Sequence, residues 1–163
     1  MNYIHPTAII YDNVELGDNI YIGPYCIIGA PGEHRGFWDY NVSGRVIISS
    51  NCVLTGHVTI DSGTENNTII DHNVWMLKHS HVGHDAWIGK YTTISCGAKI
   101  GGHAIIGSKC NIGLNAVIHQ RQIIAAGCMI GMGAVVTKKL ITKPYQKYAG
   151  NPAKWLGPNE PNK

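Results

Sequence analysis

The chain has 163 residues and a formal net charge of +3, the size of one ordinary domain. Only 14% of the residues are charged and 44% are hydrophobic, which excludes an intrinsically disordered chain. Twenty-three Ile and ten Val stand against six Leu, and β-branched side chains favour strands over helices. The sequence lacks an apolar run of about 18 residues and a signal-peptide pattern, so we expect a soluble cytoplasmic β-protein.

An aliphatic residue recurs at every sixth position along most of the chain, in twenty hexads. The first run begins at Ile4, a second at Ile48, and a third continues unbroken from Ile70 to Val136. A strict period of six fits neither the two-residue alternation of a half-buried strand nor the 3.6-residue period of a helix alone. The period fits short strands and turns that wind around a common axis, each coil stacking on the last.

The cysteines and the basic residues give no sign of a disulfide framework or a nucleic-acid site. Five cysteines is an odd number, and no C-x-x-C pair is present for structural zinc. Four of them fall at the small, inward position of the hexad, which is typical of buried apolar residues. The pI is about 8.6 without a run of Lys or Arg, so we expect no nucleic-acid partner.

The repeats, such as residues 22–27 (IGPYCI) and 88–93 (IGKYTT), resemble those of the hexapeptide-repeat proteins. The resemblance implies an all-β, left-handed parallel β-helix of triangular section, with three hexads per coil, and a homotrimer. Twenty hexads then make six to seven coils. We expect the β-helix domain over residues 1–142, with a protruding loop at 30–45, and a C-terminal tail over 143–163.

Two insertions interrupt the repeat. The loop at 30–45 carries Arg35 and Trp38, which either contact the substrate or pack against a neighbouring subunit. The second insertion, residues 62–67, is short and polar, which favours a plain surface turn.

One face of the predicted helix gathers histidines. With three hexads per coil, those beginning at Ile60, Val82, Ile100, Ile118 and Val136 stack on one another. This face carries Asp61, His81, His84, Asp85, His103, His119 and Gln120. A His beside an Asp on a rigid scaffold suits general-base chemistry, because a carboxylate can orient the imidazole and stabilise its protonated form.

Residues 76–85, 102–103 and 119–120 resemble the UDP-N-acetylglucosamine O-acyltransferases. The resemblance implies that His84 is the general base, that Asp85 is its partner, and that the Gly102 N–H binds the oxyanion. A substrate cleft between subunits would be lined by His81, His103, His119 and Gln120, with Asp61, Arg35 and Trp38 as further contacts. The chain departs from that family in having fewer coils, no helical C-terminal domain, Asp61 where a His is expected and Met132 where long-chain enzymes keep a small residue. These departures disfavour a long-chain donor on acyl carrier protein.

The tail at residues 150–154 (GNPAK) is similar to the ending of hexapeptide acetyltransferases that use acetyl-CoA. This similarity implies acetyl-CoA as a co-substrate, with no permanently bound cofactor. Its predicted binding residues are Lys138, Lys139, Asn151, Pro152, Ala153 and Lys154, the lysines serving as point charges for the phosphates.

The leading hypothesis is an acyltransferase that moves an acyl group, acetyl from acetyl-CoA, to a hydroxyl or amine of a sugar or nucleotide sugar. An acyl-carrier-protein-dependent UDP-N-acetylglucosamine O-acyltransferase is the alternative. A zinc enzyme like the γ-class carbonic anhydrases is disfavoured, because Gly89 stands where a second ligand would lie, and we expect no metal. A non-catalytic scaffold is the remaining alternative.

Overall fold

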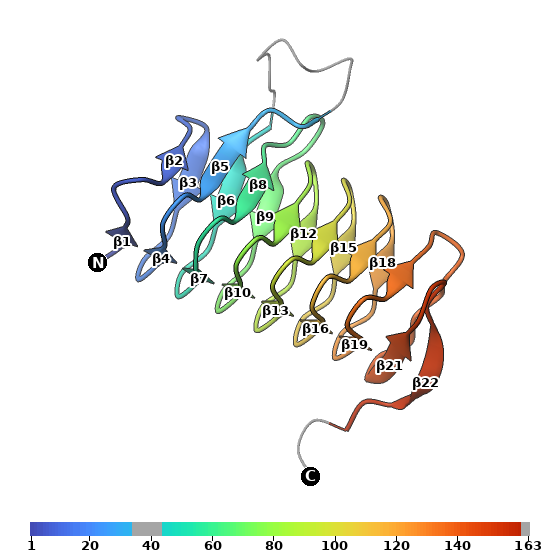
Figure 1. Ribbon diagram of the computed structural model, residues 1–163. Helices are drawn as coiled ribbons and strands as arrows, with labels where there is room; N and C mark the ends of the chain where they lie inside the picture. Colours follow the sequence, from blue (N-terminus) through green and yellow to red (C-terminus); the bar gives the residue numbers. More distant parts are fainter. Residues whose placement is uncertain (34–43, 161–163) are drawn as a thin grey trace.

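The computed structural model describes residues 1–33 and 44–160, and these form a parallel β-solenoid with no helix (Figure 1). Arg35 and Trp38 lie outside the described residues. The all-β class, with the architecture of a left-handed β-helix, is confirmed. The described part of the chain offers no helix with the length and apolar character needed to cross a membrane.

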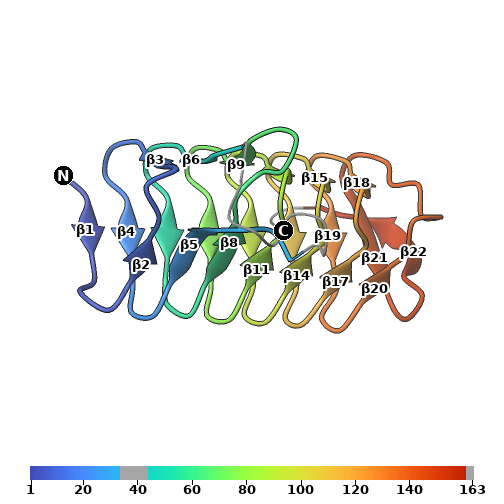
Figure 2. The same ribbon diagram turned by 90° about the horizontal axis from the view of Figure 1, so that it is seen from above.

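Short strands stack into three sheets that run along the solenoid axis (Figure 2). The first sheet contains, in spatial order, β1 (Tyr3–Ile4), β4 (Tyr21–Ile22), β7 (Val53–Leu54), β10 (Trp75–Met76), β13 (Thr93–Ile94), β16 (Asn111–Ile112), β19 (Met129–Ile130), β21 (Gln146–Ala149) and β22 (Lys154–Pro158). The second contains β2 (Ile9–Ile10), β5 (Ile27–Ala30), β8 (Thr59–Asp61), β11 (His81–Val82), β14 (Lys99–Ile100), β17 (Val117–Ile118) and β20 (Val135–Val136). The third contains β3 (Val14–Leu16), β6 (Val46–Ile48), β9 (Thr68–Ile70), β12 (Trp87–Ile88), β15 (Ile105–Ile106) and β18 (Ile123–Ile124).

The repeat register predicted from the hexads is the register of the sheets. Residues 18 positions apart pair in parallel, as His81 does with Lys99, and Val82 pairs with Ile100. The hexad aliphatics of the central coils point inward and are fully buried, Ile88 and Ile100 among them. Ile4 remains 43% exposed because the first coil has no coil beneath it. The core is therefore a stack of aliphatic layers inside the three sheets.

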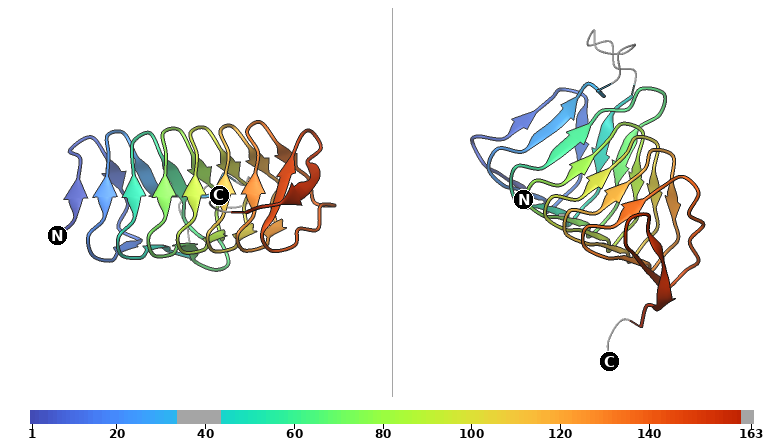
Figure 3. Two further views of the ribbon diagram at one scale, coloured as in Figure 1. Left: turned by 90° about the horizontal axis from the view of Figure 1, so that it is seen from below. Right: turned by 45° about the vertical axis from the view of Figure 1, so that its right-hand side comes forward.

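The solenoid has about eight turns, slightly more than the six to seven expected. Beyond the last hexad, β21 pairs in parallel with β19 and becomes the eighth parallel strand of the first sheet, a strand that the hexad count omits. β22 then pairs antiparallel with β21, and this hairpin lies at the opposite end of the solenoid from β1 (Figures 1 and 3).

Both insertions leave the coils paired in parallel, with one irregularity between Ile28 and Ala30, where β5 enters the first insertion. Val14 pairs with Val46, 32 positions later, so the first loop adds residues without displacing the next coil. His81 pairs with Thr59 across 22 positions, four more than a regular coil. The five cysteines are free; Cys26, Cys52, Cys110 and Cys128 are buried, as their hexad position predicts.

Candidate active site

His84 and Asp85 lie in the turn between β11 and β12 and form a hydrogen-bonded pair. His84 Nδ1 lies 2.7 Å from Asp85 Oδ2. The Asp85 side chain is fully buried, whereas 19% of the His84 side chain is exposed. Asp85 has a left-handed backbone with a φ of 59°, which Asp tolerates better than most residues. A buried carboxylate that holds an imidazole at the surface is an arrangement suited to general-base chemistry.

The second insertion wraps around the Asp85 carboxylate. Oδ1 accepts hydrogen bonds from the N–H groups of Glu65 and Asn66 at 2.9 and 2.5 Å, and the Thr64 hydroxyl donates to Oδ2 at 2.7 Å. Burial alone would raise the pKa of Asp85, but these donors and His84 together lower it below its usual range. Asp85 is therefore held as the anion.

The interpretation of residues 62–67 as a plain surface turn is wrong for the first half of the segment, whereas residues 65–67 are exposed as expected. Ser62 is fully buried and Thr64 is 7% exposed. The polar sequence of this insertion predicted exposure, but its donors turn inward to solvate a buried carboxylate. The sequence signal that could have revealed this is position, since the insertion immediately precedes the coil that carries His84.

Two glycines enclose the His84 ring. A Cβ on Gly102 would lie 2.6 Å from His84 Nε2, and a Cβ on Gly32 would lie 2.9 Å from His84 Cβ. Within the described chain the Gly102 N–H makes no hydrogen bond. His84 Nε2 therefore faces Gly102, the residue whose main-chain N–H is free to donate.

His103 stands over this pair from the next coil. Its ring meets the His84 ring edge-on, with centroids 5.0 Å apart. His103 Nε2 lies 3.6 Å from Asp85 Oδ2. The ligand atoms of His84, Asp85 and His103 fall within 4.8 Å of one another, but the carboxylate oxygens already accept the hydrogen bonds described above. These hydrogen bonds explain the cluster, so we assign no metal ion to it.

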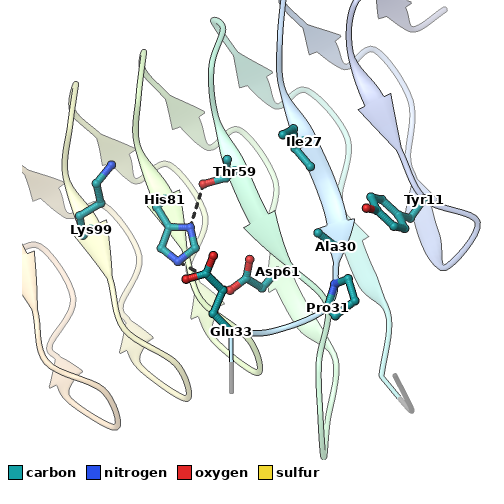
Figure 4. Close-up of a pocket in the computed structure, with 9 residues that line it drawn as sticks. All are labelled: Tyr11, Ile27, Ala30, Pro31, Glu33, Thr59, Asp61, His81 and Lys99. Carbon is teal, nitrogen blue, oxygen red and sulfur yellow. Dashed lines mark hydrogen bonds and ion pairs between the residues drawn. The ribbon is translucent and has the colours of Figure 1, made fainter. Parts of the chain in front are cut away.

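A groove of about 470 Å³ opens over the outer face of the second sheet (Figure 4). Its lining residues are Tyr11, Ile27, Ala30, Pro31, Glu33, Thr59, Asp61, His81 and Lys99. His81 Nδ1 lies 2.8 Å from the Thr59 hydroxyl, and His81 Nε2 lies 3.7 Å from Asp61 Oδ2. Glu33, Asp61 and His81 point toward one another (Figure 4). Gly32 packs against His84, and the next residue, Glu33, lines the groove. Residues 32–33 therefore connect the His84–Asp85 pair with the groove.

Two side chains that line the groove, Asp61 and His81, have shifted pKa values. Burial and the neighbouring Glu33 carboxylate raise the pKa of Asp61 to about 7. Burial, together with the positive charge of Lys99, lowers the pKa of His81. Asp61 thus changes its protonation close to neutral pH, beside His81 in the groove.

We expect Asp61→Asn to remove a pH dependence of stability. Between about pH 4 and pH 7 the folded protein keeps the Asp61 proton that the unfolded chain releases, so the wild type loses stability as pH rises through this window. The variant should gain up to about 4 kcal/mol over the wild type between pH 4 and pH 8. Urea unfolding at each pH measures this, with Asp18→Asn, an exposed Asp on another turn, as the control. Parallel pH curves for Asp61→Asn and the wild type would contradict it.

The structure brings most of the predicted substrate residues into one region but leaves two at its edge. His119 and Gln120 are exposed on the coil after His103, and His119 Nδ1 lies 2.7 Å from the Gln120 carbonyl oxygen. The main chain of Gln120 packs against Gly101, and Gly101 lies in the coil next to the one that carries His84 and Asp85. Thr64, Gly32 and Glu33 also belong to this region, and no repeat position marks them because they lie in the two insertions.

The residues predicted to bind CoA are divided. Lys138 lines a separate groove of about 370 Å³ with Arg121, Leu140 and Ile141. Lys139, Asn151, Pro152 and Lys154 are exposed and do not line that groove. Ala153 is buried, and its N–H donates to the Val135 carbonyl oxygen at 2.8 Å, so its role in the fold is to attach the tail to the solenoid.

Comparison with known proteins relates the chain to acyltransferases. No family model matches it. It is 34% identical over 110 residues to the acyl-[acyl-carrier-protein]–UDP-N-acetylglucosamine O-acyltransferase of Rickettsia canadensis, covering 59% of this chain and 36% of the relative. It is 31% identical over 102 residues to the carnitine operon protein CaiE of Proteus sp., covering 59% of this chain and 46% of that protein. The chain thus spans less than half the length of these two curated relatives.

Comparison with solved structures gives the same relationship. LpxA, a UDP-N-acetylglucosamine acyltransferase of Bacteroides fragilis, superposes with a TM-score of 0.90 and 27% identity, covering 97% of this chain and 61% of LpxA. PerB of Caulobacter crescentus, solved with CoA and GDP-perosamine, shares the fold at a TM-score of 0.57 and 20% identity, covering 96% of this chain and 57% of PerB. The chain is therefore a left-handed β-helix protein whose resemblance to the hexapeptide-repeat acyltransferases, expected from its repeats, is confirmed.

Proposed function

We propose that the protein transfers an acyl group from a thioester to a hydroxyl or amino group of a nucleotide sugar, with His84 as the general base. The observation that carries this proposal is the pair formed by His84 and the buried Asp85, beside the free N–H of Gly102. The similarity to UDP-N-acetylglucosamine acyltransferases supports the substrate class.

Each group in the pair has one task in this reaction. Asp85 accepts a hydrogen bond from the Nδ1–H of His84, which keeps that proton on Nδ1 and leaves the Nε2 lone pair to take the proton of the acceptor. The acceptor attacks the thioester carbonyl directly, and the Gly102 N–H stabilises the oxyanion that forms. The protonated His84 then returns the proton to the departing thiolate, so that no acyl-enzyme is needed. The substrate-binding roles of His81, His103, His119, Gln120 and Asp61 belong to the same proposal.

For the donor we propose acetyl-CoA, on the similarity of the tail and on the groove that holds Lys138 and Arg121. A second candidate is an acyl chain on acyl carrier protein, which the Rickettsia relative uses by its name. Met132 is 75% exposed, and its bulk at the end predicted for the acyl groove favours the shorter chain. We also propose a cytoplasmic homotrimer; the exposed Trp87, Ile105 and Ile123 on the third sheet support a subunit interface.

The direct test incubates the protein with UDP-N-acetylglucosamine and either acetyl-CoA or acyl carrier protein loaded with short and long chains. Mass spectrometry of the nucleotide sugar then identifies any acyl product. We expect an acetylated product from acetyl-CoA. Product only from the loaded carrier protein would favour the second candidate, and a repeat with amino-sugar nucleotides that also gives no product would overturn the proposal.

Lys138→Glu should weaken the binding of CoA at least about 10-fold, because it reverses a charge placed to meet a phosphate. Isothermal titration calorimetry with CoA measures the change. Lys109→Glu makes the same charge change at an exposed position outside the groove and should leave binding unaltered. Equal losses in both variants would point to nonspecific attraction and contradict the Lys138 groove as the CoA site.

A further inference from the structure

We propose that Thr64 is a positioning residue for His84, acting through the Asp85 carboxylate. This inference rests on the proposed function, in which His84 is the general base. It adds Thr64 as a third side chain to the His84–Asp85 pair. Thr64 comes from the second insertion, outside the repeat that supplies His84 and Asp85.

The Thr64 hydroxyl and the His84 ring meet at the same oxygen of the Asp85 carboxylate. The hydroxyl donates to Asp85 Oδ2 at 2.7 Å, and His84 Nδ1 lies 2.7 Å from the same oxygen. The Thr64 oxygen itself is 3.4 Å from His84 Nδ1. Thr64 and Asp85 are both buried at these atoms, so water is a poor substitute for the hydroxyl.

The two oxygens of Asp85 are held by different means. Oδ1 accepts hydrogen bonds only from main-chain N–H groups, those of Thr64, Glu65 and Asn66. These donors do not depend on which side chains the insertion carries. Oδ2 is the oxygen that receives His84; the Thr64 N–H also reaches it at 3.1 Å, and the Thr64 hydroxyl adds its side-chain donor at 2.7 Å. The main chain thus holds the carboxylate in place, and the hydroxyl sets the direction in which Oδ2 presents its lone pairs.

The direction of the Oδ2 lone pairs matters because His103 is a second histidine close enough to compete for this oxygen. His103 Nε2 lies 3.6 Å from Asp85 Oδ2, from the next coil. Without the Thr64 hydroxyl, Oδ2 loses its shortest donor from Thr64, and the carboxylate can tilt toward His103 and away from His84. His84 would then lose the contact that holds its proton on Nδ1 and leaves Nε2 free to accept one. The hydroxyl thus keeps the carboxylate committed to the catalytic imidazole.

The test uses ¹⁵N NMR of histidine-labelled protein at pH 9, which reads the His84 tautomer without substrate. We expect the Nδ1–H form in the wild type and in Thr64→Ser, which keeps the hydroxyl. In Thr64→Val the ratio should shift about 10-fold toward the Nε2–H form, the effect of one lost charge-assisted hydrogen bond. Thr92→Val, which removes a buried hydroxyl hydrogen-bonded to the Gly107 carbonyl in another coil, should leave the tautomer unchanged.

Acyl transfer provides the second readout. Thr64→Val should lower kcat about 10-fold with little change in KM, and Thr64→Ser should restore it. An unchanged His84 tautomer in Thr64→Val would overturn the proposal. A shifted tautomer in a protein whose wild type transfers no acyl group would uphold the positioning of His84 by Thr64 and reject the proposed function.

Discussion

His84→Ala is expected to reduce the rate of acyl transfer by about 10²- to 10⁴-fold, the contribution of a positioned general base. The fold should not change, since the ring lies at the surface of a turn between two glycines and contributes no aliphatic layer to the core. Steady-state kinetics with the donor that gives product measures the rate. Circular dichroism melting gives the stability, and we expect the melting curves of variant and wild type to coincide within a few degrees.

The chain contains its own control for this variant. His72 forms a similar pair with Asp71, with His72 Nδ1 2.8 Å from Asp71 Oδ1, on a different corner of the solenoid. His72→Ala removes an imidazole from an Asp in the same way but should leave acyl transfer intact. If His84→Ala retained more than about a tenth of the wild-type rate, His84 would not be the base.

Gly102→Ala should also abolish most activity, by about 10²-fold or more. A Cβ at this position would lie 2.6 Å from His84 Nε2, so the imidazole must move away from the position where it takes the acceptor proton. The same methyl group would narrow the space beside the N–H proposed to bind the oxyanion. Both consequences act on the transition state, so kcat should fall more than KM rises.

A double-variant cycle separates this explanation from a general loss of stability. In His84→Ala protein the methyl group at position 102 no longer meets a ring. Gly102→Ala should therefore destabilise the wild type measurably and the His84→Ala variant much less. Equal destabilisation in both backgrounds would show that the methyl group clashes with something other than His84.

The sequence predicted the fold well because a solenoid is a periodic object. Each hexad reports the same inward position, so the spacing of Ile60, Val82 and Ile100 is enough to place them in one column, and they pair in that register. The end of the solenoid was harder to predict. β21 joins the first sheet although residues 143–149 carry no hexad, so this additional strand has no signal in the repeat.

The candidate site could be predicted only where it follows the repeat. His84 and His103 occupy repeat positions, and the periodicity brings them into adjacent layers. Thr64 lies in an insertion with no counterpart 18 residues away, so no register argument could place it against Asp85. The contacts of Arg35 and Trp38 with a substrate stay a prediction, since both fall outside the described residues.

The turn that carries the pair has a consequence for how such proteins diversify. Asp85, His103 and Arg121 occupy equivalent positions in successive coils, each with a left-handed backbone, and the N–H groups of His103 and Arg121 bond to the carbonyls of His84 and Gly102 in the previous coil. Because the main chain supplies this geometry, the fold tolerates a carboxylate, an imidazole or a guanidinium there. Point mutation along one edge can therefore exchange reactive groups while the scaffold is inherited unchanged, and new specificities can evolve without an intermediate that fails to fold.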